Sequence, residues 1–143
     1  MSLEPPIAEL MTPDPQVLGP TDSVGMAARL MEGASIRHLP IIDDGGRIVG
    51  VVSQRDLLTA SDGERRVGEV MSREVVTAAA ETPAHAVATL MLHHKIGCVP
   101  VVDHRGLLVG IVTDSDMVRA ACVLLGGNPT LDDVLDGGDF DQA

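Results

Sequence analysis

The sequence is almost without aromatic residues: Phe140 stands alone, with no tryptophan and no tyrosine among 143 residues. Proteins that bind single-stranded nucleic acids stack bases on aromatic side chains, so this class is disfavoured. Positive charge is also scarce, because ten Lys and Arg face 21 Asp and Glu, giving a formal net charge of −11. A protein that neutralises many phosphates needs the opposite balance, and we therefore expect no nucleic-acid partner.

Long hydrophobic runs and cysteine motifs are missing as well. No apolar stretch approaches the roughly 18 residues of a membrane span, and the first residues lack the basic and apolar regions of a signal peptide. We therefore expect a soluble, cytoplasmic protein that does not bind membranes. Cys98 and Cys122 have no CxxC spacing, which favours two buried thiols over a disulfide framework or a thiolate zinc site.

The main feature that is present is a tandem repeat. Residues 7–60 align without a gap on residues 67–120 at an offset of 60, and about 14 of roughly 54 positions are identical. The identities include Met11 with Met71 and Gly50 with Gly110. We predict a first repeat at 7–60, a polar linker at 61–66, a second repeat at 67–121 whose last helix continues to about 125, and an acidic C-terminal tail at 126–143.

Each copy begins with a brief predicted strand, at 16–18 in the first, followed by a helix. Apolar residues recur at i, i+3, i+4 and i+7 through Val24–Met31 and Ala84–Met91, which indicates one buried helix face. Asp22 and Thr82 occupy the expected N-cap position, with Pro83 suited to the first helical position.

Two β-branched runs separated by a glycine-containing loop come next, and a second helix, at 53–60 or 113–125, closes each copy. Pro40 and Pro100 lie inside these runs and predict an edge or a bulge, because proline cannot donate to the strand ladder. One copy is too small to be stable alone. The predicted fold is therefore α/β (α+β), with two β-α-β-β-α repeats packed as a pseudo-twofold pair.

The junction of the third strand and second helix carries the chemically informative motif. Ser53 is followed three residues later by Asp56, and Thr113 by Asp116. A hydroxyl and an acid at this spacing form a capping box, which satisfies backbone N–H groups at a helix start. The same pair beside a glycine also offers an acceptor for a ribose diol and a phosphate-facing helix N-terminus. The residues alone leave both interpretations open.

The doubled pattern closely resembles a tandem pair of CBS (cystathionine β-synthase) domains, the Bateman module. In each copy an apolar-Pro-apolar-apolar-Asp segment is followed by Gly, two apolar residues, Ser or Thr, two variable residues and Asp. The resemblance covers residues 7 to about 121. It implies a regulatory module without catalysis or a required cofactor, which binds AMP, ADP, ATP or S-adenosylmethionine in clefts between the repeats.

The resemblance also assigns site residues. It makes Asp56 and Asp116 acceptors for the ribose diol, and Ser53 and Thr113 contacts for phosphate or ribose. It places the adenine against the residues just before each strand proline and against the segment before each first helix: Arg37, His38 and Leu39; Gly97, Cys98 and Val99; Val17 and Val76.

The two copies differ in their donors for phosphate. Arg37 and Arg55 in the first copy stand opposite Gly97 and Ser115 in the second. Guanidinium groups bind phosphate with paired, charge-assisted hydrogen bonds, so we predict two unequal sites. Because the clefts lie between the repeats, the sequence does not indicate which cleft receives the arginines.

Catalysis and metal binding are not expected. The sequence has no nucleophile elbow, Walker loop, GxGxxG or HExxH motif. His93 and His94 are adjacent and would point to different faces of a helix, so they do not form a ligand pair.

The resemblance to CBS pairs implies, as the preferred function, an energy or metabolite sensor that forms a homodimer and signals to a separate, unidentified partner protein. The alternative is a constitutive dimerisation module that binds no ligand and uses its two acids only as helix caps.

Overall fold

The structure, a computed structural model, describes residues 4–60 and 62–130. Its elements in chain order are a 3-10 turn η1 (Ile7–Glu9), β1 (Thr12–Pro13), α1 (Val24–Ala34), β2 (His38–Ile42), β3 (Ile48–Ser53), α2 (Gln54–Thr59), α3 (Val67–Val70), β4 (Ala78–Ala79), α4 (Ala84–His94), β5 (Cys98–Val102), β6 (Leu108–Thr113) and α5 (Asp114–Leu124). No helix within these two ranges is long and apolar enough to cross a membrane.

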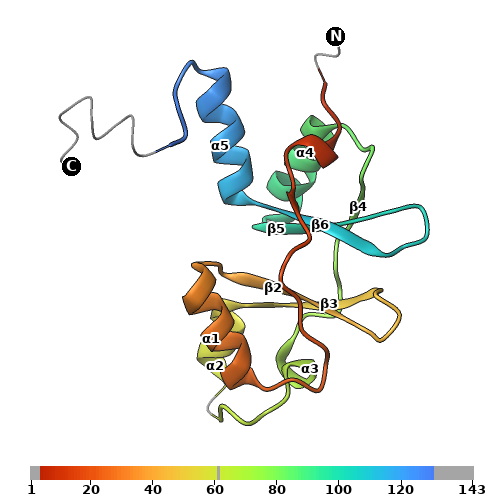
Figure 1. The fold of residues 1–143 in the computed structure, drawn as a ribbon, viewed down its shortest axis with the longest axis vertical. Coiled ribbons are helices and arrows are strands. Elements are labelled where there is room, and N and C mark those ends of the chain that lie inside the picture. The colour runs from red at the N-terminus through yellow and green to blue at the C-terminus, as the bar shows by residue number, and fades with distance from the viewer. Residues whose placement is uncertain (1–3, 61, 131–143) are drawn as a thin grey trace, which may run out of the picture.

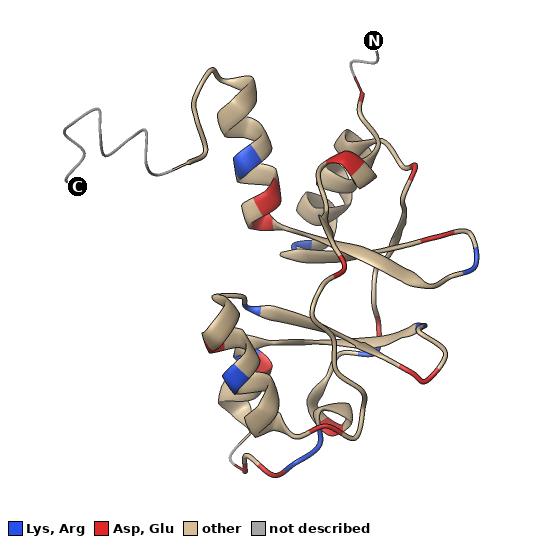
Figure 2. Cartoon of the chain, in the orientation of Figure 1, with Lys and Arg blue, Asp and Glu red and all other residues tan. Residues whose placement is uncertain are grey.

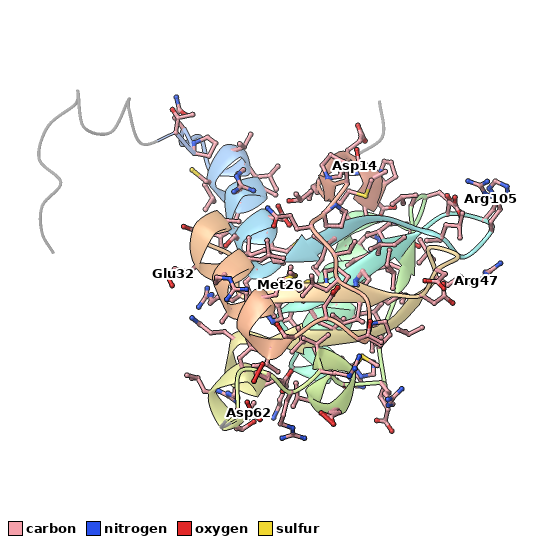
Figure 3. The ribbon with its side chains drawn as sticks, turned by 60° about the horizontal axis from the view of Figure 1, so that its bottom comes forward. Asp14, Met26, Glu32, Arg47, Asp62 and Arg105 are labelled. Atoms are coloured by element: carbon pink, nitrogen blue, oxygen red, sulfur yellow. The ribbon has the colours of Figure 1, made fainter. Side chains whose placement is uncertain are left out.

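Two antiparallel hairpins, β2–β3 and β5–β6, face each other in the middle of the molecule, with the helices on their outer sides (Figure 1). Arg47 joins the two hairpin tips, because its Nη1 donates to the carbonyl oxygen of Arg105 at 2.7 Å (Figure 3). The irregularity expected near the strand prolines is confirmed one residue further on, where the register shifts between Ile41 and Ile42 and at the equivalent place in β5.

The repeats exchange their first segments. β1, from the first repeat, pairs with β6 of the second, while Ser72, from the second repeat, forms a bridge with Val51 in β3. The exchange continues at the helices: the N–H of Ile7 donates to Thr82 O at 2.7 Å, and the N–H of Val67 donates to Asp22 O at 2.8 Å. We therefore define the first half as α1, β2, β3, α2 and α3, and the second half as η1, β1, β4, α4, β5, β6 and α5.

This exchange gives a physical reason for two identities between the repeats. Met71 lies against Gly50 of the first half, where an added Cβ would come within 2.9 Å of the methionine Cγ, and Met11 lies against Gly110 of the second half in the same way. Each glycine lets the other repeat's methionine approach the strand. Ile7 is fully buried in the core of the second half, and Val67 is fully buried in the core of the first, so the exchanged segments complete both cores.

The strand predicted at 16–18 is wrong. Within the described residues this segment contributes a single parallel bridge from Leu18 to Ile41, whereas the equivalent Ala78–Ala79 forms β4, parallel to β5. The extended pairing before α1 is made earlier, by β1, because the chain there crosses to the other half.

The predicted helix caps also differ. Ser23, not Asp22, caps α1, and its Oγ accepts from the N–H of Met26 at 3.0 Å. The Asp22 carboxylate instead accepts from the N–H of Gly19 at 2.8 Å and closes the preceding turn. Pro83 is the N-cap of α4 rather than its first helical residue. Of the predicted acidic tail, positions 131–143 lie outside the described residues.

Candidate ligand-binding clefts

Both strand-to-helix junctions form the predicted caps. In the first half the N–H of Asp56 donates to Ser53 Oγ at 3.1 Å, and the N–H of Ser53 donates to Asp56 Oδ2 at 2.8 Å. This reciprocal pair fixes the start of α2. Asp56 Oδ1 has no hydrogen-bond partner within the described residues, so capping occupies one oxygen and leaves the other open.

Asp116 is bound more tightly than Asp56. Its side chain is only 4% exposed, and its Oδ2 accepts from the N–H of Thr113 at 2.9 Å and from the Thr113 hydroxyl at 3.3 Å. Its Oδ1 accepts from the Thr12 hydroxyl and from Arg119 Nη1, each at 3.0 Å. Because Thr12 belongs to the exchanged segment, this carboxylate also ties β1 to the start of α5.

The larger of two clefts encloses about 990 Å³ between the halves. Two aspartates are followed by one arginine at the start of α5, which faces the helices of the first half (Figure 2). The cleft falls within the size range of sites for drug-sized ligands. Seven of the predicted site residues line it: Arg37, His38, Ser53, Arg55, Gly97, Thr113 and Asp116.

The smaller cleft encloses about 300 Å³ and is lined by β3 and α2 of the first half together with the segments before β4 and β5. Six of the predicted site residues line it: His38, Ser53, Asp56, Val76, Gly97 and Cys98. The structure therefore distributes the two predicted ribose acceptors between the clefts, with Asp116 in the larger and Asp56 in the smaller.

Three predicted residues line neither cleft. Leu39 and Val99 are fully buried in the cores of the first and second halves, because they are inner positions of β2 and β5. Val17 is half-buried, and its neighbour Gln16 lines the larger cleft instead. The structure thus places these three side chains apart from the residues with which they were grouped.

The clefts also contain residues that the sequence analysis missed. Thr12 and Asp14 line the larger cleft, and their equivalents Ser72 and Glu74 line the smaller. Their equal spacing in the repeat could have revealed them, but only together with the segment exchange. Arg119 lies one helical turn after Asp116, a spacing that allows an ion pair on one helix face.

The arginines belong to one cleft. Arg37 and Arg55 both line the larger cleft, as does Arg119, while no Arg or Lys of the described residues lines the smaller. The larger cleft therefore combines two arginines of the first half with Thr113 and Asp116 of the second. It brings donors for a phosphate into one space with Asp116, whose oxygens already accept from Thr113, Thr12 and Arg119.

The wall between the clefts is formed by residues that line both, chiefly His38 and Gly97. A Cβ at Gly97 would lie 2.9 Å from Asp114 Oδ2 and 3.5 Å from His38 Cε1, so a side chain has little room there. Burial lowers the pKa of His38 below 6.5, against the opposing effect of Asp114, and the imidazole is neutral at pH 7. Burial raises the pKa of the Cys98 thiol to about 12, which keeps it protonated.

The described part of the chain contains no group of three or more His, Cys, Asp or Glu placed to hold a metal ion. His93 and His94 are exposed, and their rings are in edge contact with centroids 5.4 Å apart. They lie at the end of α4, away from both cleft linings.

Comparison with known proteins identifies the family. The family model that matches is the CBS domain, over residues 7–63 and 67–122. A crystal structure from Vibrio cholerae, provisionally named acetoin utilization protein AcuB, is 42% identical, with a TM-score of 0.81 and coverage of 87% of this chain and 96% of that one. The chain spans only 21–23% of the length of the curated enzymes that it matches, inosine-5′-monophosphate dehydrogenases and a homoserine O-acetyltransferase among them.

Two further solved structures contain ligands. The CBS domain pair of protein MJ0100, in complex with 5′-methylthioadenosine and S-adenosyl-L-methionine, is 31% identical, with a TM-score of 0.79 and coverage of 85% of this chain and 98% of that one. CBSX2 in complex with AMP is 32% identical, with a TM-score of 0.76 and the same coverage. With two matched repeats that span most of its length, this chain belongs to the CBS domain family and folds as a CBS domain pair.

Proposed function

We propose that this chain is a non-catalytic regulatory module that binds adenine nucleotides or adenosyl ligands in its two clefts and signals metabolic state to a separate partner protein. The observation that carries the proposal is the larger cleft, where side chains from both halves converge on about 990 Å³. The AMP and adenosyl ligands in similar CBS pairs support the choice of ligand class.

The larger cleft suggests how binding is converted into a signal. A nucleotide whose ribose hydroxyl donates to Asp116, in place of one of its present donors, touches the second half, and its phosphate reaches Arg37 and Arg55 of the first half. Such a ligand favours the arrangement in which both contacts are made. A partner protein that binds this arrangement more tightly than others responds to the ligand, and the coupling free energy is set by the difference between its two affinities.

The second candidate is a constitutive dimerisation module without a ligand. It is favoured by one observation: Asp56 and Asp116 do cap their helices, so both acids have a structural use. It predicts that substituting either acid lowers stability and changes nothing else.

A thermal-shift titration separates the two candidates. The purified chain is heated with AMP, ADP, ATP, S-adenosylmethionine or NADH, with ribose 5-phosphate as a control for binding by phosphate alone. A ligand at about 100 times its Kd adds about 2.7 kcal/mol to the free energy of unfolding and raises the Tm. Asp56→Ala and Asp116→Ala are tested beside Glu32→Ala, which removes an exposed acid of α1 outside both clefts.

A rise in Tm that is lost in one aspartate variant, but kept in the Glu32 control, supports the sensor and identifies its cleft. The absence of a rise with every ligand, with aspartate variants that are only less stable, contradicts the sensor and favours the assembly module.

The exposed apolar side chains of the helices support a homodimer as the form in which the module acts. They lie on α2, α4 and α5 and just beyond α5: Leu58, Leu92, Val118, Val123, Leu124 and Leu125. Leu58 and Val118 occupy equivalent repeat positions and are 81% and 67% exposed. We propose that they contribute to one face that a second copy covers, since a symmetric pair covers the same face on both copies.

A further inference from the structure

The two clefts differ in charge as well as in volume. The larger cleft is lined by three arginines and three aspartates, whose formal charges cancel. The smaller cleft is lined by Asp56 and Glu74, with no Arg or Lys of the described residues beside them. Its histidine, His38, lies on the shared wall and is neutral at pH 7 because burial lowers its pKa. The clefts of one internally repeated chain therefore offer different electrostatic environments.

The charges also differ in their availability. In the larger cleft Asp116 and Arg119 are already paired, whereas the side chains of Arg37 and Arg55 have no hydrogen-bond or ion-pair partner within the described residues and are exposed. Two guanidinium groups are thus free to bind an anion. In the smaller cleft Asp56 Oδ1 is open and Glu74 is exposed, so the charged groups that an anion meets there are both carboxylates. Like charges at short range are unfavourable, most of all where water is partly excluded.

Adenosyl ligands come in forms that match this division. A nucleoside monophosphate carries a dianionic 5′ group, 5′-methylthioadenosine carries an uncharged thioether at the same position, and S-adenosylmethionine carries a sulfonium cation. We infer that the clefts sort ligands by the charge of the 5′ substituent: the larger cleft takes a nucleoside phosphate, and the smaller takes a nucleoside whose 5′ group is uncharged or cationic. This inference rests on the proposed function, since it assigns ligands to the same two clefts.

The repeat itself supplies the sharpest variants. Arg37→Gly with Arg55→Ser gives the first copy the residues that the second has at the equivalent positions. Both arginines are exposed and unpartnered in the described structure, so this variant retains its fold. Arg29→Ser with Lys95→Ser removes the same charge at exposed, unpartnered residues outside both cleft linings and is the matched control. Asp56→Asn removes the open carboxylate of the smaller cleft.

Calorimetric titrations with AMP and with 5′-methylthioadenosine, each on the wild type and on the three variants, test the inference. In the variant Arg37→Gly with Arg55→Ser, the loss of two charge-assisted donors is expected to weaken AMP binding by about tenfold or more. The same variant should bind 5′-methylthioadenosine within about twofold of the wild type, and the control should bind both ligands normally. Asp56→Asn should show the opposite pattern, with weaker 5′-methylthioadenosine and unchanged AMP.

Three results overturn the inference. If Arg37→Gly with Arg55→Ser lowers the affinity for both ligands equally, or for neither, the charge of the 5′ substituent does not sort the ligands. Binding of either ligand by the wild type would still support the proposed function. Equal losses of both ligands in Asp56→Asn show that AMP also uses the smaller cleft. Failure of the wild type to bind either ligand refutes the proposed function, and the sorting of ligands with it.

Discussion

The two capping aspartates predict a large difference in stability between two chemically identical substitutions. Asp116→Asn replaces a carboxylate that accepts from four donors, while Asp56→Asn replaces one that accepts only from the N–H of Ser53. The asparagine oxygen keeps part of these bonds, but at Asp116 its NH₂ group faces either the two Thr113 donors or those of Thr12 and Arg119 in place of an acceptor. Leaving buried donors unsatisfied costs about 1–3 kcal/mol.

The magnitude follows from the exposure of each partner. Arg119 is 58% exposed, so its ion pair contributes less than about 1 kcal/mol, and loss of the cap itself costs about 1 kcal/mol. Together with the unsatisfied donors, Asp116→Asn is expected to lower the free energy of unfolding by about 3 kcal/mol. Asp56→Asn is expected to lower it by about 0.5–1 kcal/mol, because one cap bond is weakened at a half-buried position.

Thermal and urea unfolding of the unliganded variants check this difference. At roughly 3–6 °C of Tm per kcal/mol for a domain of this size, the Tm should fall by about 9–18 °C for Asp116→Asn and by about 2–6 °C for Asp56→Asn. Equal losses, or a greater loss at Asp56, would refute the view that Asp116 ties the exchanged β1 segment to α5.

Three further predictions follow from packing, titration and surface. Gly50→Ala should destabilise the fold by about 1–3 kcal/mol, because its Cβ would lie 2.9 Å from the backbone oxygen of Ser72. Gly110→Ala should cost less, because its Cβ would contact the side chain of Met11, which can turn away. A greater loss of stability for Gly110→Ala in urea unfolding would contradict this. Burial lowers the pKa of His38, so protonation below pH 6.5 favours the unfolded chain and reduces the stability of the wild type. The Tm difference between the wild type and His38→Gln should therefore shrink from pH 7.5 to pH 5, and a constant difference would refute this. Val118→Glu should shift sedimentation from dimer toward monomer by placing charge on the apolar helix face, and an unchanged dimer would exclude this face.

The repeat made most of the fold predictable. Apolar spacing located the helices, and the β-branched runs located both hairpins, because these patterns depend on local periodicity. The exchange of first segments was not predictable in this way. An identity such as Met11 with Met71 is the same whether each methionine packs in its own half or in the other, and only the position of Gly110 beneath Met11 decides between them.

The sequence predicted most of the residues that line the clefts, but not which residue lies in which cleft. Ten of the thirteen predicted residues line one cleft or the other, because the strand-to-helix junction places its side chains at the boundary between the halves. The sequence shows that Arg37 and Arg55 lack equivalents in the second copy, but the cleft they share depends on how the halves face each other. Leu39 was misplaced for a simpler reason: neighbouring strand residues point to opposite faces, and its side chain points into the core.

The most direct test of the account is a crystal structure of the chain grown with saturating AMP. The account predicts AMP in the larger cleft, with its ribose diol beside Asp116 and its phosphate beside Arg37 and Arg55. An empty larger cleft at saturating AMP, or a nucleotide bound there with its phosphate directed away from both arginines, would contradict it.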